Sequence, residues 1–379
     1  MIDTLWTEGR QEWSLALSSA TCLAFLLWGD TIFRWLPDPI WLALIFLWLF
    51  AAILVSALSV VRHAEHLALR LGEPYGTLLL TLSVTFIEVM SIAAIMLHGE
   101  SNPTLTRDTV VAVVMIILNG MVGLSLLLGG WRHREQHYNL QGANAYLGVI
   151  IPLVGLSLIL PNFTQTTPGP TLTDLQGIML VLVGIGLYAT FLAMQVGRHR
   201  GYFSFAKGHA GAEGSGHDAT TRPEATTRTY PLLVHAVLLL ANILPVVFLA
   251  EQFAHPVDYL IETLHAPAAL GGVIIAVLVA TPEAIGAVRA AMMNRLQRSV
   301  NIFLGSVLST AGLTVPAMIL VSQMIGREIV LGVEHTDSVM LMLTLAVSVV
   351  TFASGRTNVM QGAVHLVLFI VYLLLIIQG

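Results

Sequence analysis

Charged residues are scarce in this sequence, and their scarcity limits the class of protein. Only 10% of the 379 residues are Asp, Glu, Lys or Arg, and 56% are hydrophobic. A soluble domain carries about 25% charged residues, because water must wet its surface. The apolar stretches here are close to the ~20 residues that cross the hydrocarbon core of a bilayer. The sequence therefore predicts an all-α polytopic membrane protein.

Other absent features exclude further classes. Cys22 is the only cysteine and lies in an apolar segment, which excludes an internal disulfide and a cysteine-based metal site. The sequence has no phosphate loop (GxxxxGK[ST]) and no serine elbow (GxSxG). Its N-terminal MIDTLWTEGRQEW lacks the basic region of a cleaved signal peptide. We therefore expect neither an ATPase nor a hydrolase, and no cofactor.

Hydropathy predicts eleven membrane spans when it is averaged over windows of about 19 residues. Polar breaks separate the spans, and the longest break covers residues 197–229. In chain order the predicted spans are residues 13–29, 40–60, 75–97, 109–130, 144–160, 176–196, 231–250, 268–290, 301–323, 338–354 and 361–378.

Positive charge gives these spans a direction. Of the 17 Lys and Arg residues, only Arg34, Arg107 and Arg327 fall on the side opposite the N-terminus. Lys and Arg are enriched in cytoplasmic loops. The N-terminus is therefore predicted to be cytoplasmic and the C-terminus external, in a bacterial inner membrane.

The long polar break divides the helices into two groups. Residues 198–229 are rich in Gly, Ala and Thr, which predicts a flexible cytoplasmic linker rather than a folded domain. If residues 1–35 form the N-terminus and an accessory helix, residues 36–197 and 230–379 hold five helices each. A five-helix unit ends on the side opposite its start, so its copy must be inverted in the membrane. Inverted repeats that meet near the midplane are a recurring transporter architecture.

Two acidic residues lie deep inside the predicted spans. Glu88 is in the third span and Glu283 in the eighth, which are the second helices of the two proposed repeats. A charge at this depth costs at least about 2.5–3.5 kcal/mol on insertion scales and is functional by default. A structural carboxylate, protonated or paired with a donor on another helix, is the alternative for either residue alone. Their matching positions in two repeats favour an ion site.

Hydroxyl groups share the helix face that carries Glu88. Thr77, Thr81, Thr85, Glu88 and Ser91 follow one another at intervals of three or four residues, which places them within a stripe about 120° wide. Hydroxyls at this spacing can also join helices to one another. Beside a carboxylate they indicate the wall of a hydrated pathway, with Thr81 and Thr85 as candidate cation ligands.

The eighth span offers further oxygen ligands around Glu283. Pro282 has no N–H, so the carbonyl of Leu278 loses its helical partner and the helix is expected to kink. Irregular backbone at this depth is tolerated only where it is buried or lines a cavity. The Thr281 hydroxyl and the Leu278 carbonyl therefore join Glu283 as candidate ligands. Hard oxygen ligands with two negative charges suit Ca²⁺, which takes about six to eight oxygens.

Two other spans contain polar residues that could complete such a site. Asn119 lies beside Gly120 in the fourth span, and the ninth span holds Ser306, Ser309 and Thr310. These residues could supply neutral ligands, or they could simply let helices pack closely.

Two long motifs resemble a known family. Residues 72–89 read GEPYGTLLLTLSVTFIEV, residues 281–291 read TPEAIGAVRAA, and NRLQR and NIFLGS follow at 294–298 and 301–306. They resemble the two signature repeats of bacterial calcium/proton antiporters, a branch of the calcium/cation antiporter superfamily. The resemblance extends over nearly the whole chain. It implies eleven helices, two inverted five-helix repeats and one acidic ion ligand from each repeat, at the positions of Glu88 and Glu283.

The sequence departs from this family at two places. Many relatives have Gly-Asn-Ala before the first acidic residue, where this chain has Ser-Val-Thr at 83–85. Many also have a strongly acidic central segment, whereas residues 197–229 contain only Glu213, Asp218 and Glu224 as acids. Ca²⁺ regulation through this segment is therefore not predicted.

The expected activity is exchange of Ca²⁺ for H⁺ by alternating access, with cation and protons competing for Glu88 and Glu283. The same two carboxylates could hold one Na⁺ or K⁺ and retain one proton, so a Na⁺(K⁺)/H⁺ antiporter is the nearest alternative. A cation channel lined by acidic residues is a more distant one. The expected partners are inorganic cations, protons and the lipid bilayer, without nucleic acid. An oligomer cannot be predicted from the sequence.

Overall fold

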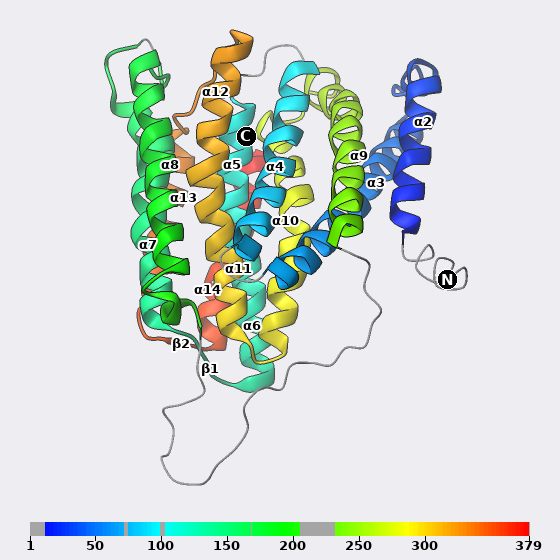
Figure 1. Ribbon diagram of the computed structural model, residues 1–379. Coiled ribbons are helices and arrows are strands. Elements are labelled where there is room, and N and C mark those ends of the chain that lie inside the picture. Colours follow the sequence, from blue (N-terminus) through cyan, green and yellow to red (C-terminus); the bar gives the residue numbers. More distant parts are fainter. Residues whose placement is uncertain (1–11, 72–74, 99–102, 168, 205–231, 379) are drawn as a thin grey trace, which may run out of the picture.

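The computed structural model describes residues 12–71, 75–98, 103–167, 169–204 and 232–378. These residues form one helical bundle, shown in Figure 1. Among them, the only β structure is a two-stranded antiparallel sheet of β1 (Gln136–His137) and β2 (Arg356–Thr357). The predicted all-α membrane fold is thus confirmed.

The first half of the bundle extends to residue 204. Its elements are α2 (Trp13–Phe33), α3 (Pro39–Leu71), α4 (Tyr75–His98), α5 (Leu105–Met115), η1 (Ile116–Met121), α6 (Val122–His133), α7 (Leu140–Val154), η2 (Gly155–Ile159), η3 (Leu160–Phe163), α8 (Asp174–Val196) and η4 (Arg200–Phe203).

The second half begins at residue 232. Its elements are α9 (Leu232–Asp258), η5 (Tyr259–Thr263), α10 (Ala269–Met292), α11 (Leu296–Ser309), η6 (Thr310–Thr314), α12 (Val315–Ile325), α13 (His335–Thr351) and α14 (Val359–Gln378).

Each of the eleven predicted spans corresponds to a helical stretch. Ten stretches in the described part of the chain are long and apolar enough to cross a membrane. The eleventh is α13, an apolar helix of 17 residues. One large boundary difference is in α3, which continues to Leu71 where hydropathy placed the end near residue 60. Hydropathy detects only the part of a helix that is apolar, so it missed the polar extension from Arg62 onward.

The two halves repeat one order of helices. Each begins with a long helix (α3 or α9), continues with a helix that carries one of the two glutamates (α4 or α10), and has a third helix interrupted by a π-helical segment. The third helices, α5–η1–α6 and α11–η6–α12, run through the bundle in opposite directions (Figure 1). The predicted arrangement of one additional helix, α2, and two inverted five-helix units is therefore present.

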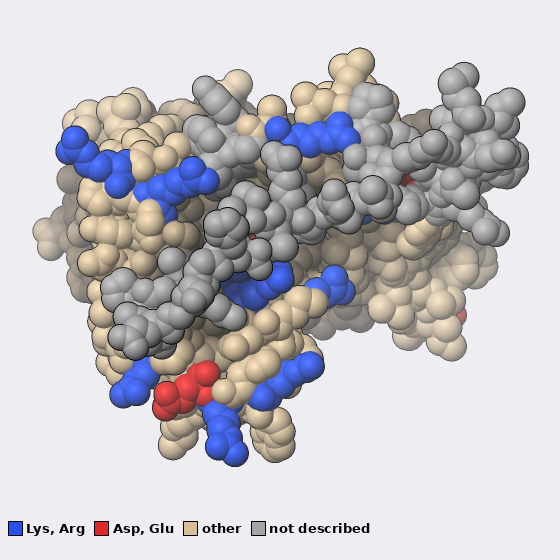
Figure 2. All heavy atoms as spheres, turned by 60° about the horizontal axis from the view of Figure 1, so that its bottom comes forward, with Lys and Arg blue, Asp and Glu red and all other residues tan. Residues whose placement is uncertain are grey.

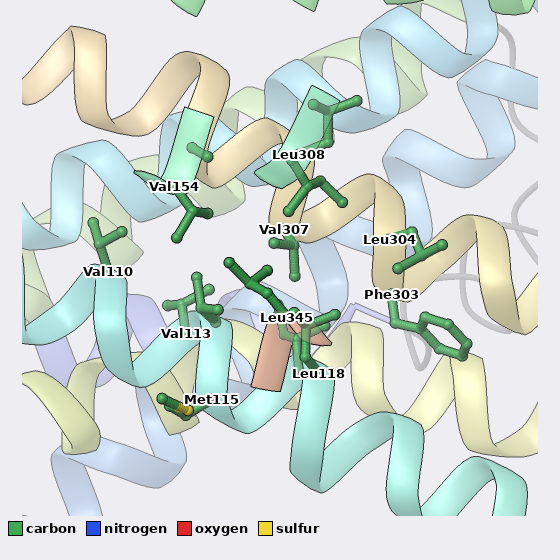
Figure 3. Packing of buried hydrophobic residues seen from close by; sticks show 14 of the residues in the cluster. Val110, Val113, Met115, Leu118, Val154, Phe303, Leu304, Val307, Leu308 and Leu345 are labelled. Atoms are coloured by element: carbon green, nitrogen blue, oxygen red, sulfur yellow. The ribbon is translucent and has the colours of Figure 1, made fainter. Parts of the chain in front are cut away.

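Two apolar clusters hold the bundle together. One joins α3, α4 and α9 through buried residues such as Leu49, Ile53 and Phe253. The other surrounds η1 and joins α5, α7, α11 and α13, and Figure 3 shows part of it. At Gly272 a side chain could not be accommodated, because its Cβ would lie 2.5 Å from the Asp108 backbone. This close approach packs α10 tightly against α5, so the helix of the second glutamate is anchored to the first repeat.

The start of the predicted flexible linker is ordered, which corrects that prediction for residues 198–204. Residues Arg200–Phe203 form η4, and the Phe203 ring is buried against Tyr146 and Phe191. Asn301 also donates a hydrogen bond to the Phe203 carbonyl at 2.8 Å. The polar composition of this segment gave no indication that its aromatic residues Tyr202 and Phe203 pack against the bundle. Residues 205–231, which include the rest of the predicted linker, and residues 1–11 lie outside the described part of the chain.

Candidate ion-binding site

Glu88 is held between the two halves of the protein. It lies on α4, and only 3% of it is exposed. The Thr310 hydroxyl lies 3.0 Å and 3.2 Å from the two carboxylate oxygens, and the Thr314 hydroxyl lies 2.9 Å from Oε2. Both threonines belong to η6 of the second half. Hydroxyl donors offset the cost of burying this carboxylate, so the acidic residue of one repeat is stabilised by the other repeat.

Glu283 is bound by the same stretch of chain. It lies on α10 and accepts a hydrogen bond from the hydroxyl of Ser306 on α11. Ser306 is four residues before Thr310, so the donors to the two glutamates lie one helical turn apart. The segment from Ser306 to Thr314 therefore joins both acidic residues in one polar site.

A cavity leads to Glu283 from one end of the bundle. It has a volume of about 410 Å³, and its lining includes Glu283, Ser306, Ser309 and Thr81. The cavity extends to an exposed ion pair in which Arg298 lies 3.3 Å from Glu65. Water and ions can thus approach Glu283 from this end, whereas Glu88 lies beyond the cavity lining.

Three further candidate ligands, Thr81, Ser309 and Thr85, differ in whether they line the cavity and in their hydrogen-bond partners. Thr81 lines the cavity, as does Tyr188. Ser309 also lines it and donates its hydroxyl to the Ser306 carbonyl at 2.9 Å. Thr85 is buried on α4, and its hydroxyl has no hydrogen-bond partner among the described residues. The Thr85 oxygen is therefore available to a ligand. The side chain of Thr77, the first residue of the predicted stripe, is outside the described part.

Around Pro282 the backbone is more regular than expected. The helix α10 continues through this residue from Ala269 to Met292, so the missing N–H does not end it. The Thr281 hydroxyl donates back to the Val277 carbonyl of its own helix at 2.5 Å, as a local hydrogen bond. The Leu278 side chain is buried. The Thr281 hydroxyl is thus bonded within its own helix and not to Glu283. The Leu278 carbonyl lacks its helical donor because Pro282 has no N–H.

Asn119 belongs to a different polar network. Its amide nitrogen donates to Thr344 at 2.8 Å, and its amide oxygen lies 3.3 Å from Nδ1 of His365. The other ring nitrogen of His365 lies 2.9 Å from the Thr351 hydroxyl. All four side chains are buried. Asn119 therefore joins η1 to α13 and α14, without a hydrogen bond to either glutamate.

Thr314 is the site residue that the sequence analysis missed. It follows Thr310 by four residues, so the two hydroxyls lie on one face of η6. That spacing could have identified it. Two π-helical segments, η1 and η6, occupy corresponding positions in the two repeats. Such segments occur frequently at functional sites because they displace side chains from regular helical positions.

The residues brought together are suited to binding either a hard cation or protons. No group of three or more His, Cys, Asp or Glu side chains in the described ranges could hold a metal ion. A cation bound here would therefore complete its coordination with hydroxyl oxygens, carbonyl oxygens and water around two carboxylates. These are the ligands that Ca²⁺ takes, in a flexible geometry.

Comparison with known proteins assigns the chain to a family. The profile of the sodium/calcium exchanger protein family matches residues 41–197 and 234–378. A candidate ionic transporter of Sinorhizobium fredii is 45% identical over 318 residues, which cover 83% of each chain. The sodium-potassium/proton antiporter ChaA of Escherichia coli is 36% identical over 367 residues, covering 97% of this chain and 96% of that protein.

A solved structure has the same fold. The Ca²⁺/H⁺ antiporter protein YfkE aligns with a TM-score of 0.68 at 19% identity, over 97% of this chain and 99% of that one. The ranges matched by the family profile include both groups of five helices and begin after α2. This protein is therefore a multi-pass membrane protein of the sodium/calcium exchanger family.

Proposed function

We propose that this protein exchanges an inorganic cation for protons across the bacterial inner membrane, with Glu88 and Glu283 as the shared binding groups. One observation carries the proposal: a single segment, Ser306–Thr314, donates hydroxyl hydrogen bonds to a carboxylate from each repeat. The two acidic groups thus form one site at the junction of the repeats.

Exchange follows from competition for these carboxylates. A cation and protons both bind carboxylate oxygens, and each neutralises the pair. An empty, ionised pair is costly at bilayer depth, so the site crosses between access states only when it is neutralised. The protein then moves a cation in one direction and protons in the other. This requirement distinguishes an antiporter from a channel, in which ions would pass without a counter-ion.

The cavity beside Glu283 supports alternating access. It opens at the end of the bundle that carries Arg200 and Arg298. Basic residues are enriched on the cytoplasmic side of membrane proteins, so we assign this end to the cytoplasm. In this assignment the described conformation is open to the inside, the N-terminus is cytoplasmic and the C-terminus is external.

For the transported cation, we propose Ca²⁺. Two carboxylates match its charge, and the Thr85 hydroxyl offers a neutral oxygen that has no other partner among the described residues. Ca²⁺ accepts an irregular shell, whereas Mg²⁺ demands near-octahedral geometry and loses water reluctantly. Mg²⁺ is therefore expected to be a poor substrate.

A monovalent cation is the second candidate. The antiporter of Escherichia coli that is 36% identical to this chain is named for sodium and potassium. A site with only two carboxylates can hold one Na⁺ or K⁺ if one proton stays bound. The same residues and the same competition would then exchange a monovalent cation for a proton.

Transport in everted membrane vesicles tests these proposals. Vesicles with an imposed proton gradient are given Ca²⁺, Mg²⁺, Na⁺ or K⁺, and proton release is followed with a pH-sensitive dye. We expect saturable proton release with Ca²⁺ and little with Mg²⁺. A response to Na⁺ without a response to Ca²⁺ would contradict the calcium assignment but not antiport. Cation flux that is not accompanied by any counter-ion movement would contradict antiport itself.

A further inference from the structure

A second hollow lies between α6 and α10 and shares no lining residue with the ion cavity. It is a groove of about 860 Å³. Three basic residues line it, namely Arg132 and His133 from the last turn of α6 and Arg289 from the last turn of α10. The rest of its lining is apolar and consists of Leu124, Ala284, Ile285, Val288, Met292 and Met293.

The groove runs from the membrane surface toward the hydrocarbon core. Trp131, next to Arg132, is 82% exposed at the end of α6, as expected of a tryptophan at the membrane–water interface. Leu124 precedes Trp131 by two helical turns, about 10 Å along the helix. Leu124 and Ile285 are both 44% exposed. The groove thus has a basic end at headgroup depth and an apolar wall at acyl-chain depth.

The two groove arginines lack an acidic partner in the described part of the chain. Among the described residues, neither Arg132 nor Arg289 forms an ion pair with Asp or Glu, whereas Arg298 pairs with Glu65. Basic side chains predominate over acidic ones on this end of the molecule, which Figure 2 shows. The positive charge at the end of the groove is therefore not neutralised by any of the described residues and is suited to an anionic ligand.

A hydrogen bond fixes the ends of the two helices that carry these arginines. The His133 ring nitrogen Nε2 donates to the Met292 carbonyl at 2.9 Å. Because Met292 ends α10 and His133 ends α6, this bond joins the two helix termini directly. The backbone that carries the two guanidinium groups is thus held in place, so it needs little further ordering when a ligand binds.

We propose that this groove binds an anionic phospholipid. Arg132 and Arg289 would hold the headgroup phosphate, since a guanidinium group binds phosphate through two parallel hydrogen bonds. An acyl chain would lie along the apolar wall formed by Ile285, Val288 and Leu124. Basic pockets between transmembrane helices are known to bind anionic headgroups in this way.

The charge of the groove favours a lipid over a second copy of this chain. Its lining contains no acidic residue. A symmetric contact through this groove would place arginines of one copy against arginines of the other, and such like-charge contacts are unfavourable. A lipid also accounts for the apolar wall, which ends at Ala284, directly after Glu283. A bound lipid would therefore contact α10 immediately beside the candidate ion site.

Native mass spectrometry of the purified full-length protein tests this inference. The protein is mixed with phosphatidylglycerol and phosphatidylcholine of the same acyl length, and the ratio of the two lipid adducts is measured. The double variant Arg132→Gln/Arg289→Gln should lower the preference for phosphatidylglycerol about twenty-fivefold, because each basic side chain near a lipid surface contributes a factor of about five. The matched control Arg134→Gln removes a neighbouring exposed arginine outside the groove and should keep the preference.

A charge-conserving variant separates binding from folding. Arg132→Lys/Arg289→Lys keeps both charges and should retain most of the preference. If the glutamine variant keeps the wild-type ratio, or if Arg134→Gln lowers it equally, the groove is not the binding site. A dimer mass that the glutamine variant abolishes, without any change in lipid adducts, would overturn the inference in favour of a second copy.

Discussion

The hydroxyl of Thr310 lies 3.0 Å from one carboxylate oxygen of Glu88 and 3.2 Å from the other. These residues are 222 positions apart and belong to opposite repeats. The contact therefore makes the first acidic residue dependent on the position of η6. Because Ser306 binds Glu283 from the preceding turn, a movement of this one segment changes the surroundings of both carboxylates.

The first prediction concerns the two acidic residues. Glu88→Gln and Glu283→Gln should each abolish proton-coupled exchange while leaving expression and membrane insertion intact. Glutamine keeps the volume but cannot ionise, so it removes both the charge partner of the cation and the proton carrier. Exchange is measured in everted vesicles, and insertion by the yield of folded protein in detergent. Near-normal exchange by either variant would remove that residue from the mechanism.

A second prediction concerns the hydrogen bond from Thr314 to Glu88, which the sequence analysis did not identify. Thr314→Val removes a donor to the ionised form of Glu88, which is bound at 2.9 Å. A hydrogen bond to a charged group contributes about 1.5–3 kcal/mol, so the pH of half-maximal exchange should move to the alkaline side by about one unit or more. Thr314→Ser keeps the hydroxyl and should keep the wild-type profile. Identical profiles for both variants would mean that this bond does not stabilise the ionised site.

A substitution at Thr85 tests whether neutral hydroxyl oxygens bind the cation. Thr85→Val removes a buried hydroxyl that lacks a partner among the described residues but keeps both carboxylates. Apparent cation affinity should fall about tenfold, with a smaller change in maximal rate, because one oxygen ligand is lost. The matched control is Thr106→Val on α5, whose buried hydroxyl also lacks a partner in the described part but lies outside the stripe of Glu88. An equal loss in both variants would point to helix packing rather than ligation.

Exchange should depend on pH in one direction. At acidic pH protons occupy the carboxylates of Glu88 and Glu283 and exclude the cation. As pH rises the protons leave, the ionised pair forms, and cation binding increases. Proton release in vesicles, measured at limiting cation concentration from mildly acidic to alkaline pH, should therefore increase. A rate that is highest at acidic pH would contradict competition at these two groups.

The central linker should be dispensable for transport. Its composition cannot support a packed core, and neither glutamate-bearing motif includes it. We expect a Gly/Ser replacement of residues 208–226, equal in length, to exchange at close to the wild-type rate. Residues 200–203 must be kept, because Phe203 is packed into the bundle. A correctly inserted but inactive protein would show that the linker takes part in transport.

Much of the fold follows from the sequence because lipid imposes a simple requirement. An apolar stretch of bilayer length must be helical, so the eleven apolar stretches in the sequence predicted the eleven membrane helices. Glu88 and Glu283 could also be identified from the sequence, because a carboxylate in an apolar span is energetically costly and is rarely kept without a function. Their closeness was inferred only from the repeat symmetry and from the family resemblance.

Partners between distant helices could not be predicted. Asn119 appeared equally suited to an ion site, but its hydrogen-bond partners Thr344 and His365 are 225 and 246 residues away. Sequence spacing gives the face of a residue on its own helix, not which neighbouring helix that face meets. Thr281 illustrates a second limit of sequence-based prediction. Its hydroxyl donates to a carbonyl of its own helix and therefore does not bond to Glu283.

The π-helical form of η6 fixes the number of residues in this part of the chain. Its hydrogen bonds close over five residues, so it holds one residue more than a regular helical turn. Deleting one residue between Thr310 and Thr314 would close this turn into regular helix and shorten the spacing of the two hydroxyls from four positions to three. The two hydroxyls would then no longer meet Glu88 as they do now. Surface loops tolerate insertions and deletions, but relatives that use this pair of hydroxyls are expected to keep the same count here, even where other side chains differ.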